Sequence, residues 1–213
     1  DCADAADDSE LMQACERVFD DIANYKMYVT GAVGSTNIGE AFTINYDLPN
    51  EKAYAETCAS IALMMFANRM AKYRKAAKYA DAAERAMYNG MLSGMSLSGD
   101  AFFYENPLEI NLANQKKVPM FKEKDHYGIV KRVEIFECSC CPPNLNRMLA
   151  AMGNYTYHIE NGECYVNQYM DSSIEDDGIS VVQTIRMTAK SELKRAVLKK
   201  CTCVFPDGVK TLT

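Results

Sequence analysis

The sequence predicts a mainly α-helical protein with a β-rich C-terminal part. Apolar residues recur at helical spacing in three segments before Gly90, and two consecutive prolines, Pro142 and Pro143, precede a fourth such segment. After Gly153 the pattern changes to short β-rich runs separated by Asn-Gly and Asp-Asp-Gly turns. We therefore expect a helical domain over residues 1–153 and a β domain over residues 154–213.

The first half of the chain is predicted to hold three helices and a long loop. The first helix is expected at about residues 9–26, with Ser9 as its N-cap, and two more at about 51–73 and 75–89. The short connection between the last two makes them an antiparallel pair, which Gly90 ends. Residues 28–50 are rich in glycine and small residues and are expected to form an irregular loop, a type of segment that often carries function.

The second half is predicted to change from loops to a helix and then to strands. Residues 102–104 are aromatic and are expected to be extended, whereas 107–119 are expected to form a loop. A helix should follow Pro142-Pro143, because proline is tolerated in a first turn, and it should end near Gly153. Strands are expected at 155–159, 164–169 and 179–187.

Composition and charge exclude several classes of protein. The chain has 213 residues, of which 48% are hydrophobic and 24% charged, so it can bury a sizeable core. The net charge of -6 and the absence of a dense Lys/Arg stripe argue against nucleic acid or an anionic membrane surface as the partner, and no apolar run is long enough to span a bilayer. The acidic first residues run directly into a helical pattern without an initiating Met, so we expect the chain to be a segment of a longer protein.

The cysteines indicate metal binding or thiolate chemistry. There are nine, an odd number, and Cys138, Cys140 and Cys141 fall within four positions, where adjacent cysteines would form a strained bridge. They precede a predicted helix, and the positive end of a helix dipole favours the thiolate. Small buried or surface thiols are the simpler interpretation of the other cysteines outside this cluster, which are Cys2, Cys15, Cys164, Cys201 and Cys203.

Two adjacent cysteines need further ligands to complete a tetrahedral metal site, and Glu56 and Cys58 are candidates. Residues two apart in a regular helix point about 200° from each other, so both can face one metal only at a helix end or a distortion. Spacing alone supports a metal site and a pair of unmetallated buried thiols equally. Likewise Glu40 is, on these grounds, a solvated loop charge, and the two histidines, His126 and His158, do not support a zinc-protease helix motif or a Ser-His-Asp triad.

Several segments together carry a specific resemblance to glycoside hydrolase family 127. In order and spacing, the matching segments are residues 27–31 (MYVTG), 39–42 (GEAF), 46–50 (YDLPN), 54–60 (YAETCAS), 88–90 (YNG) and 140–144 (CCPPN). The resemblance covers roughly residues 10–170. It implies the C-terminal portion of an (α/α)6 barrel in residues 1–153 and the beginning of a β-sandwich in 154–213, without the first half of the barrel.

The resemblance also implies a chemistry and a set of site residues. Members of this family release β-L-arabinofuranose with retention of configuration. For this chain the family pattern implies Zn²⁺ held by Glu56, Cys58, Cys140 and Cys141, with Cys140 as nucleophile and Glu40 as acid/base. It further suggests Tyr104 as a sugar contact and leaves Cys138 outside the metal ligands. A zinc-bound cysteine is held deprotonated near neutral pH and can attack an anomeric carbon.

Three functions follow as hypotheses. The first is a zinc-thiolate glycosidase that acts on a small carbohydrate substrate, an arabinofuranoside. The second is a structural zinc module without catalysis, and the third is a carbohydrate-binding or assembly domain with ordinary buried thiols. Free thiols favour a reducing, cytoplasmic compartment, and a homo-oligomer is compatible with the sequence.

Overall fold

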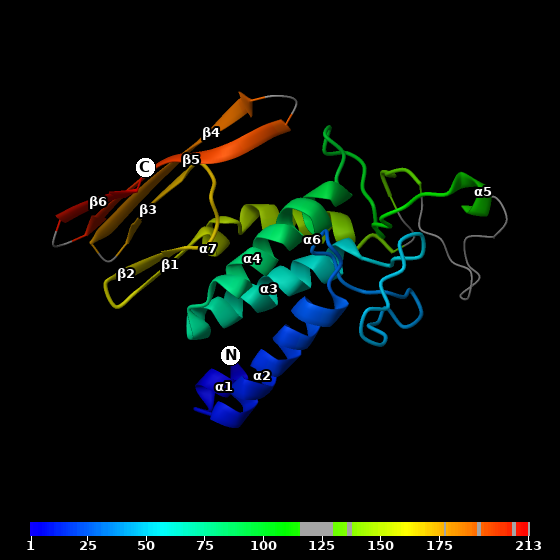
Figure 1. Ribbon diagram of the computed structural model, residues 1–213, viewed down its shortest axis with the longest axis horizontal. Helices are drawn as coiled ribbons and strands as arrows, with labels where there is room; N and C mark the ends of the chain where they lie inside the picture. Colours follow the sequence, from blue (N-terminus) through cyan, green and yellow to red (C-terminus); the bar gives the residue numbers. More distant parts are fainter. Residues whose placement is uncertain (116–129, 136–137, 177, 191–192, 206–207, 213) are drawn as a thin grey trace. The chain divides into compact units, whose positions relative to one another are not determined.

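The computed structural model describes residues 1–115, 130–135, 138–176, 178–190, 193–205 and 208–212 (Figure 1). The chain divides into two compact units, Asp1–Leu149 and Ala150–Thr213. We call them the helical unit and the β unit. A mixed helix-and-strand class is thus confirmed, whereas the (α/α)6 barrel, the β-sandwich and a domain boundary at residue 153 stay predictions.

The helical unit contains α-helices that are extended by short π- or 3₁₀-helical turns. Along the chain they are α1 (Cys2–Ala5), α2 (Ser9–Asp21) with η1 (Ile22–Lys26), α3 (Thr57–Arg74), α4 (Ala77–Arg85) with η2 (Ala86–Met91) and η3 (Leu92–Gly94), α5 (Leu112–Gln115) and α6 (Cys141–Ala150). Among the described residues no helix combines the length and the hydrophobicity of a membrane span.

The predicted helices are present, with two corrections at their N-termini. The N-cap of α2 is Asp8 rather than Ser9, because the Asp8 carboxylate accepts a hydrogen bond from the Leu11 amide at 2.9 Å. Helix α3 begins at Thr57, six residues later than predicted. The preceding residues are not helical because Ala55 has a positive φ of 39° and its amide donates to the Gly34 carbonyl at 2.8 Å.

Helices α3 and α4 lie side by side and are joined by residues 75–76, which makes them the predicted antiparallel pair (Figure 1). Phe19 of α2 packs edge-on against Phe66 of α3 and Tyr79 of α4, with ring centroids 5.5 and 4.6 Å apart. Ile61 and Met64 of α3 are also buried. This packing fixes the direction of α3, which carries candidate site residues at its N-terminus.

The loop predicted at residues 28–50 is present and is longer than predicted, since it runs over residues 27–56. Isolated bridges connect Met27 with Val33 and Thr36 with Ala41. Gly31, with φ of 86°, lies against the backbone where α4 continues into η2, and a Cβ at this position would be 2.5 Å from the Ala86 nitrogen. The loop is therefore seated on the second helix of the pair.

The helix predicted to follow Pro142-Pro143 is present as α6, but it begins earlier than predicted, at Cys141, because both prolines fit within its first turn. It ends at Ala150, and a separate short helix α7 (Gly153–Thr156) follows. Phe102 pairs with Met95 and Val133 through isolated antiparallel bridges, which confirms an extended backbone at that position.

The β unit holds two antiparallel sheets. Strands β1 (Tyr157–Glu160) and β2 (Glu163–Val166) form a hairpin whose turn residues Asn161 and Gly162 both have positive φ, as the predicted Asn-Gly turn requires. The second sheet has the order β3-β4-β5-β6, with bounds Ser172–Asp176, Ile179–Lys190, Leu193–Phe205 and Gly208–Leu212. Tyr157 of the hairpin and Ile179 and Val181 of β4 form a buried cluster, and partly buried side chains of both sheets pack against it.

The seating of the loop on η2 predicts a strong effect of Gly31→Ala. The added methyl group overlaps the η2 backbone and the substituted residue must keep a positive φ, so we expect a loss of about 2 kcal/mol or more in unfolding free energy. Gly99→Ala is the control, because Gly99 also has a positive φ but no atom within 4 Å of an added Cβ, and should cost about 1 kcal/mol. Denaturant unfolding of the full-length protein measures both, and equal losses would contradict this seating.

Candidate active site

Four potential metal ligands from distant parts of the chain meet in the helical unit. One ligand atom each of Glu56, Cys58, Cys140 and Cys141 lies within 4.8 Å of the others. Oε1 of Glu56 is 3.5 Å from the Cys140 sulfur and 3.6 Å from the Cys141 sulfur. The Cys140 sulfur is 3.8 Å from the sulfurs of both Cys58 and Cys141. We call these four residues the ligand cluster.

The start of α3 explains how Glu56 and Cys58 can both face the ligand cluster. Glu56 is the N-cap residue, with φ of -61° and ψ of 140°, and so lies outside the regular helix. Cys58 is the second residue inside the helix. The 200° separation of a regular helix therefore does not apply to this pair, and the helix end that the sequence required is present.

A neighbouring segment holds this helix start in place. The Thr57 amide donates to the Tyr104 carbonyl at 3.0 Å, and the Thr57 hydroxyl donates to the Phe103 carbonyl at 2.9 Å. The side-chain amide of Asn106 donates to the Ala55 carbonyl at 2.9 Å. These bonds satisfy backbone groups that the helix leaves free at its N-terminus and fix the backbone on both sides of Glu56.

The other two ligands lie at the start of α6. Cys141 is the first helical residue and is fully buried, and the Asn144 amide donates to the Cys140 carbonyl at 3.2 Å. The side chain of Asn144 accepts from Arg147 at 2.6 Å and also hydrogen-bonds the Cys58 sulfur. One turn of α6 thus contributes two sulfurs and contacts the third.

Four of the six distances within the ligand cluster fit a tetrahedral zinc site, and the other two are at most 4.8 Å. Zn–S bonds of about 2.3 Å and Zn–O bonds of about 2.0 Å at tetrahedral angles place two sulfurs about 3.8 Å apart and a sulfur and an oxygen about 3.5 Å apart. The S···S distances of 3.8 Å and the O···S distances of 3.5 and 3.6 Å agree with these values. A set of three sulfurs and one carboxylate oxygen also suits Zn²⁺ better than Mg²⁺ or Ca²⁺.

The electrostatics of the ligand cluster favour a bound cation. Burial raises the pKa of Cys140 to about 12, although a hydrogen bond with Tyr104 opposes this increase. A hydrogen bond with Cys58 and burial raise the pKa of Cys141 well above its usual range, while the same bond lowers the pKa of Cys58 to about 7. Without a cation, Cys58 is thus the sulfur that loses its proton most readily, and Cys140 and Cys141 resist deprotonation. Deprotonation of all three sulfurs requires a positive charge among them.

Glu40 lies at the corner of a tight turn between Thr36 and Ala41, with a positive φ of 50°. Its Oε1 accepts hydrogen bonds from the hydroxyls of Tyr54 at 2.6 Å and Tyr104 at 3.1 Å. Glu40 is an exposed loop residue, as its interpretation as a solvated charge requires, but its carboxylate is also held by two phenols. Tyr104 also hydrogen-bonds Cys140, so its hydroxyl connects Glu40 with the ligand cluster.

The sequence assigned no role to Tyr54. It is 4% exposed, and burial together with the Glu40 hydrogen bond raises its pKa far above the usual range, so the phenol keeps its proton and remains a donor. In the sequence, the signal for a role of Tyr54 in the site was its position two residues before Glu56. A tyrosine at that position can equally be core, so the signal was not decisive.

Other candidates lie outside the site. Cys138 is exposed and is not part of the ligand cluster. His158 lies in β1 of the β unit, where its ring nitrogen is 3.5 Å from the Glu160 carboxylate, and His126 lies outside the described residues. Cys2, Cys15 and Cys164 take part in no disulfide bond among the described residues; Cys2 is exposed, and Cys15 and Cys164 are half-buried.

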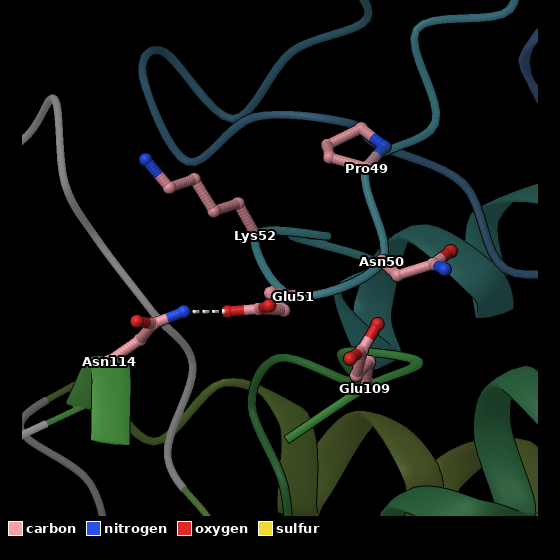
Figure 2. A pocket seen from close by; sticks show the side chains of 6 residues that line it. All are labelled: Pro49, Asn50, Glu51, Lys52, Glu109 and Asn114. Atoms are coloured by element: carbon pink, nitrogen blue, oxygen red, sulfur yellow. Dashed lines mark hydrogen bonds between the residues drawn. The ribbon is translucent and has the colours of Figure 1, made fainter. Parts of the chain in front are cut away.

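Figure 2 shows a separate polar pocket of about 350 Å³ beside the loop that precedes α3. Its lining residues are Pro49, Asn50, Glu51, Lys52, Glu109 and Asn114. The Asn114 side-chain amide donates to the Glu51 carboxylate at 2.6 Å, and the Leu108 amide donates to the Asn50 carbonyl at 3.0 Å. These contacts brace the loop, and no residue of the ligand cluster lines the pocket.

The chain matches a family model and a curated relative. The model describes a β-L-arabinofuranosidase, GH127 catalytic domain, and it matches residues 1–154. The relative is a non-reducing end β-L-arabinofuranosidase of Bifidobacterium longum subsp. longum, which is 40% identical over 158 residues. This match covers 73% of the chain but 23% of the relative, so the chain spans about a quarter of that enzyme's length.

Solved structures give the same result. A GH127 β-L-arabinofuranosidase from Geobacillus stearothermophilus T6 is similar with a TM-score of 0.81 and 38% identity, over 96% of this chain and 31% of that one. A second GH127 β-arabinofuranosidase is similar with a TM-score of 0.75 and 32% identity, over 95% and 29% of the two chains.

The geometry of the ligand cluster predicts that Cys58→Ala removes the bound metal. Loss of one of three sulfurs leaves an incomplete ligand set, so we expect zinc per chain in the full-length protein to fall from about one to near zero under moderate chelation. Elemental analysis of reduced protein measures this. Cys138→Ala, which removes an exposed thiol outside the cluster, should keep its zinc. Equal zinc contents in the two variants would show that the cluster is not the metal site.

Proposed function

The chain belongs to glycoside hydrolase family 127, the β-L-arabinofuranosidases, and we propose from this membership that the full-length protein releases β-L-arabinofuranose from a small carbohydrate substrate with retention of configuration. One observation supports the proposal most: the ligand cluster and the Glu40 carboxylate are connected through the Tyr104 hydroxyl. Two groups that contact the same hydroxyl are near each other, as a nucleophile and a proton donor must be to act on one glycosidic bond.

In this proposal Glu56, Cys58, Cys140 and Cys141 hold Zn²⁺. When bound, the cation keeps the sulfurs deprotonated near neutral pH, although burial raises the pKa of the Cys140 thiol. The chain supplies the rest of the arrangement. Cys58 and Cys140 are half-buried whereas Cys141 is fully buried. Of these sulfurs, Cys140 is the one that contacts Tyr104, the phenol that also donates to Glu40. Cys140 is therefore proposed as the sulfur that attacks the substrate.

The first step forms one bond and breaks one. The Cys140 sulfur attacks the anomeric carbon, the carbon–sulfur bond forms, and the glycosidic carbon–oxygen bond breaks. Glu40 donates its proton to the departing oxygen and becomes a carboxylate. The aglycone leaves as a neutral alcohol.

The second step reverses these roles. Glu40 takes a proton from water, the water oxygen attacks the anomeric carbon, and the carbon–sulfur bond breaks to return the Cys140 thiolate. Each step inverts the anomeric carbon, so the product retains the original configuration. Tyr104, which is partly exposed beside both groups, is proposed to hydrogen-bond a sugar hydroxyl.

A structural zinc module is the second candidate, since a buried cluster that connects α3 with α6 would also stabilise the helical unit. A purely structural role does not explain why the hydroxyls of Tyr54 and Tyr104 hydrogen-bond the exposed Glu40 carboxylate beside that cluster. A carbohydrate-binding domain with unmetallated thiols gives no reason for sulfur distances that match tetrahedral zinc. The glycosidase accounts for both features.

The proposal predicts that Cys140→Ser abolishes hydrolysis of β-L-arabinofuranosides by the full-length protein. A serine hydroxyl is a much weaker nucleophile than a thiolate, so we expect kcat to fall roughly 10³-fold or more. Cys138→Ser is the matched control from the same segment and should retain turnover. Mass spectrometry of wild-type protein with a slowly hydrolysed substrate should find the sugar on the peptide that contains Cys140.

Unchanged turnover by Cys140→Ser would exclude Cys140 as the nucleophile. Zinc-loaded wild-type protein that hydrolyses no arabinofuranoside would instead support the structural module.

A further inference from the structure

Tyr54 acts on Glu40 without access to the substrate. Its side chain is 4% exposed, and its hydroxyl lies 2.6 Å from Oε1 of Glu40. A ring with so little exposed surface cannot contact a sugar that is bound beside Glu40. Any effect of the Tyr54 hydroxyl on a reaction there must therefore pass through a group that it contacts, which is the Glu40 carboxylate at 2.6 Å or the Tyr104 hydroxyl.

The two oxygens of Glu40 are not equivalent. Oε1 accepts hydrogen bonds from both Tyr54 and Tyr104. A carboxylate oxygen has two lone-pair positions, so these two donors occupy both of them. Within the part of the chain that the structure describes, no residue donates a hydrogen bond to Oε2, which leaves this oxygen to carry a proton.

Glu40 needs hydrogen bonds from other residues to fix its carboxylate, because its own backbone restrains the side chain little. It lies in a positive-φ turn at the surface, and its side chain has three rotatable torsions. Tyr54 is fixed by contrast: its ring is buried, and its carbonyl accepts from the Asn106 amide at 3.3 Å. The short segment from Tyr54 to Cys58 thus contacts the acid/base and also provides two members of the ligand cluster.

We propose that Tyr54 is a positioning residue that anchors Glu40 through Oε1 and so reserves Oε2 for proton exchange with the leaving oxygen and with water. This inference rests on the proposed glycosidase function. The buried Tyr54 holds one lone-pair position of Oε1 throughout, whereas Tyr104, whose single hydrogen can also turn toward Cys140, holds the second in this structure. The orientation of Oε2 is then the same in both steps.

The test compares wild-type and Tyr54→Phe full-length proteins on aryl β-L-arabinofuranosides whose phenols differ in acidity. The constant kcat/KM reports the step in which the phenol leaves. We expect it to fall on the order of 10²-fold for the least acidic phenol, because the misplaced acid protonates it poorly. For the most acidic phenol, which leaves without protonation, we expect little loss. Zinc content should equal that of wild type.

Tyr28→Phe is the matched control. Tyr28 belongs to the same loop, is 2% exposed, and its hydroxyl donates to the Pro49 carbonyl at 3.3 Å rather than to Glu40. Removal of this hydroxyl also deletes a hydrogen bond from a buried phenol, so it reproduces the cost in stability. Any loss of kcat/KM in Tyr28→Phe should be the same for every phenol.

The outcomes separate the inference from the function on which it rests. A Tyr54→Phe protein with no loss, or with an equal loss for all phenols, overturns the positioning role while the glycosidase proposal stands. The same dependence on phenol acidity in Tyr28→Phe overturns it as well. Failure of the wild-type protein to hydrolyse any member of the series overturns the proposed function, and the inference with it.

Discussion

The chemistry of the helical unit depends on one convergence: three sulfurs and a carboxylate oxygen that lie close enough together to share one cation. Four groups that can each carry a negative charge repel one another at these distances. The thiols show this conflict: burial raises the pKa of Cys140, and a hydrogen bond with Cys58 together with burial raises the pKa of Cys141. A cation bound by these four groups would remove the repulsion and connect the start of α3 with the start of α6.

The residues at which α3 and α6 begin are determined by local backbone torsions, hydrogen bonds and prolines as well as by the ligand cluster. At α3, the positive φ of Ala55 and the bonds from residues 103–106 delay the helix until Thr57, which leaves Glu56 as an N-cap beside Cys58. At α6, Pro142 and Pro143 fall in the first turn, where their missing N–H groups cost nothing. The loop with Glu40 is seated on η2 through Gly31 and reaches the cluster through Tyr54 and Tyr104.

Much of this could be predicted from the sequence. Helical periodicity identified the antiparallel pair α3 and α4, and the Asn-Gly turn identified the β1–β2 hairpin, because both signals are local. The start of α3 was misplaced because a hydrogen bond from Ala55 to Gly34 overrides the apolar pattern of residues 51–56. The ligand cluster was undecidable from spacing, since its two halves are more than eighty residues apart, and only the family resemblance brought them together. Tyr54 was missed because its role appears only in the side-chain contact with Glu40.

X-ray absorption at the zinc edge on the full-length protein tests the central convergence most directly, because it reports the identity, number and distances of the ligand atoms. The account predicts one zinc per chain with three sulfurs at about 2.3 Å and one oxygen at about 2.0–2.2 Å. Zinc coordinated by nitrogen and oxygen alone, or protein that contains no zinc when prepared reduced and without chelators, would contradict it.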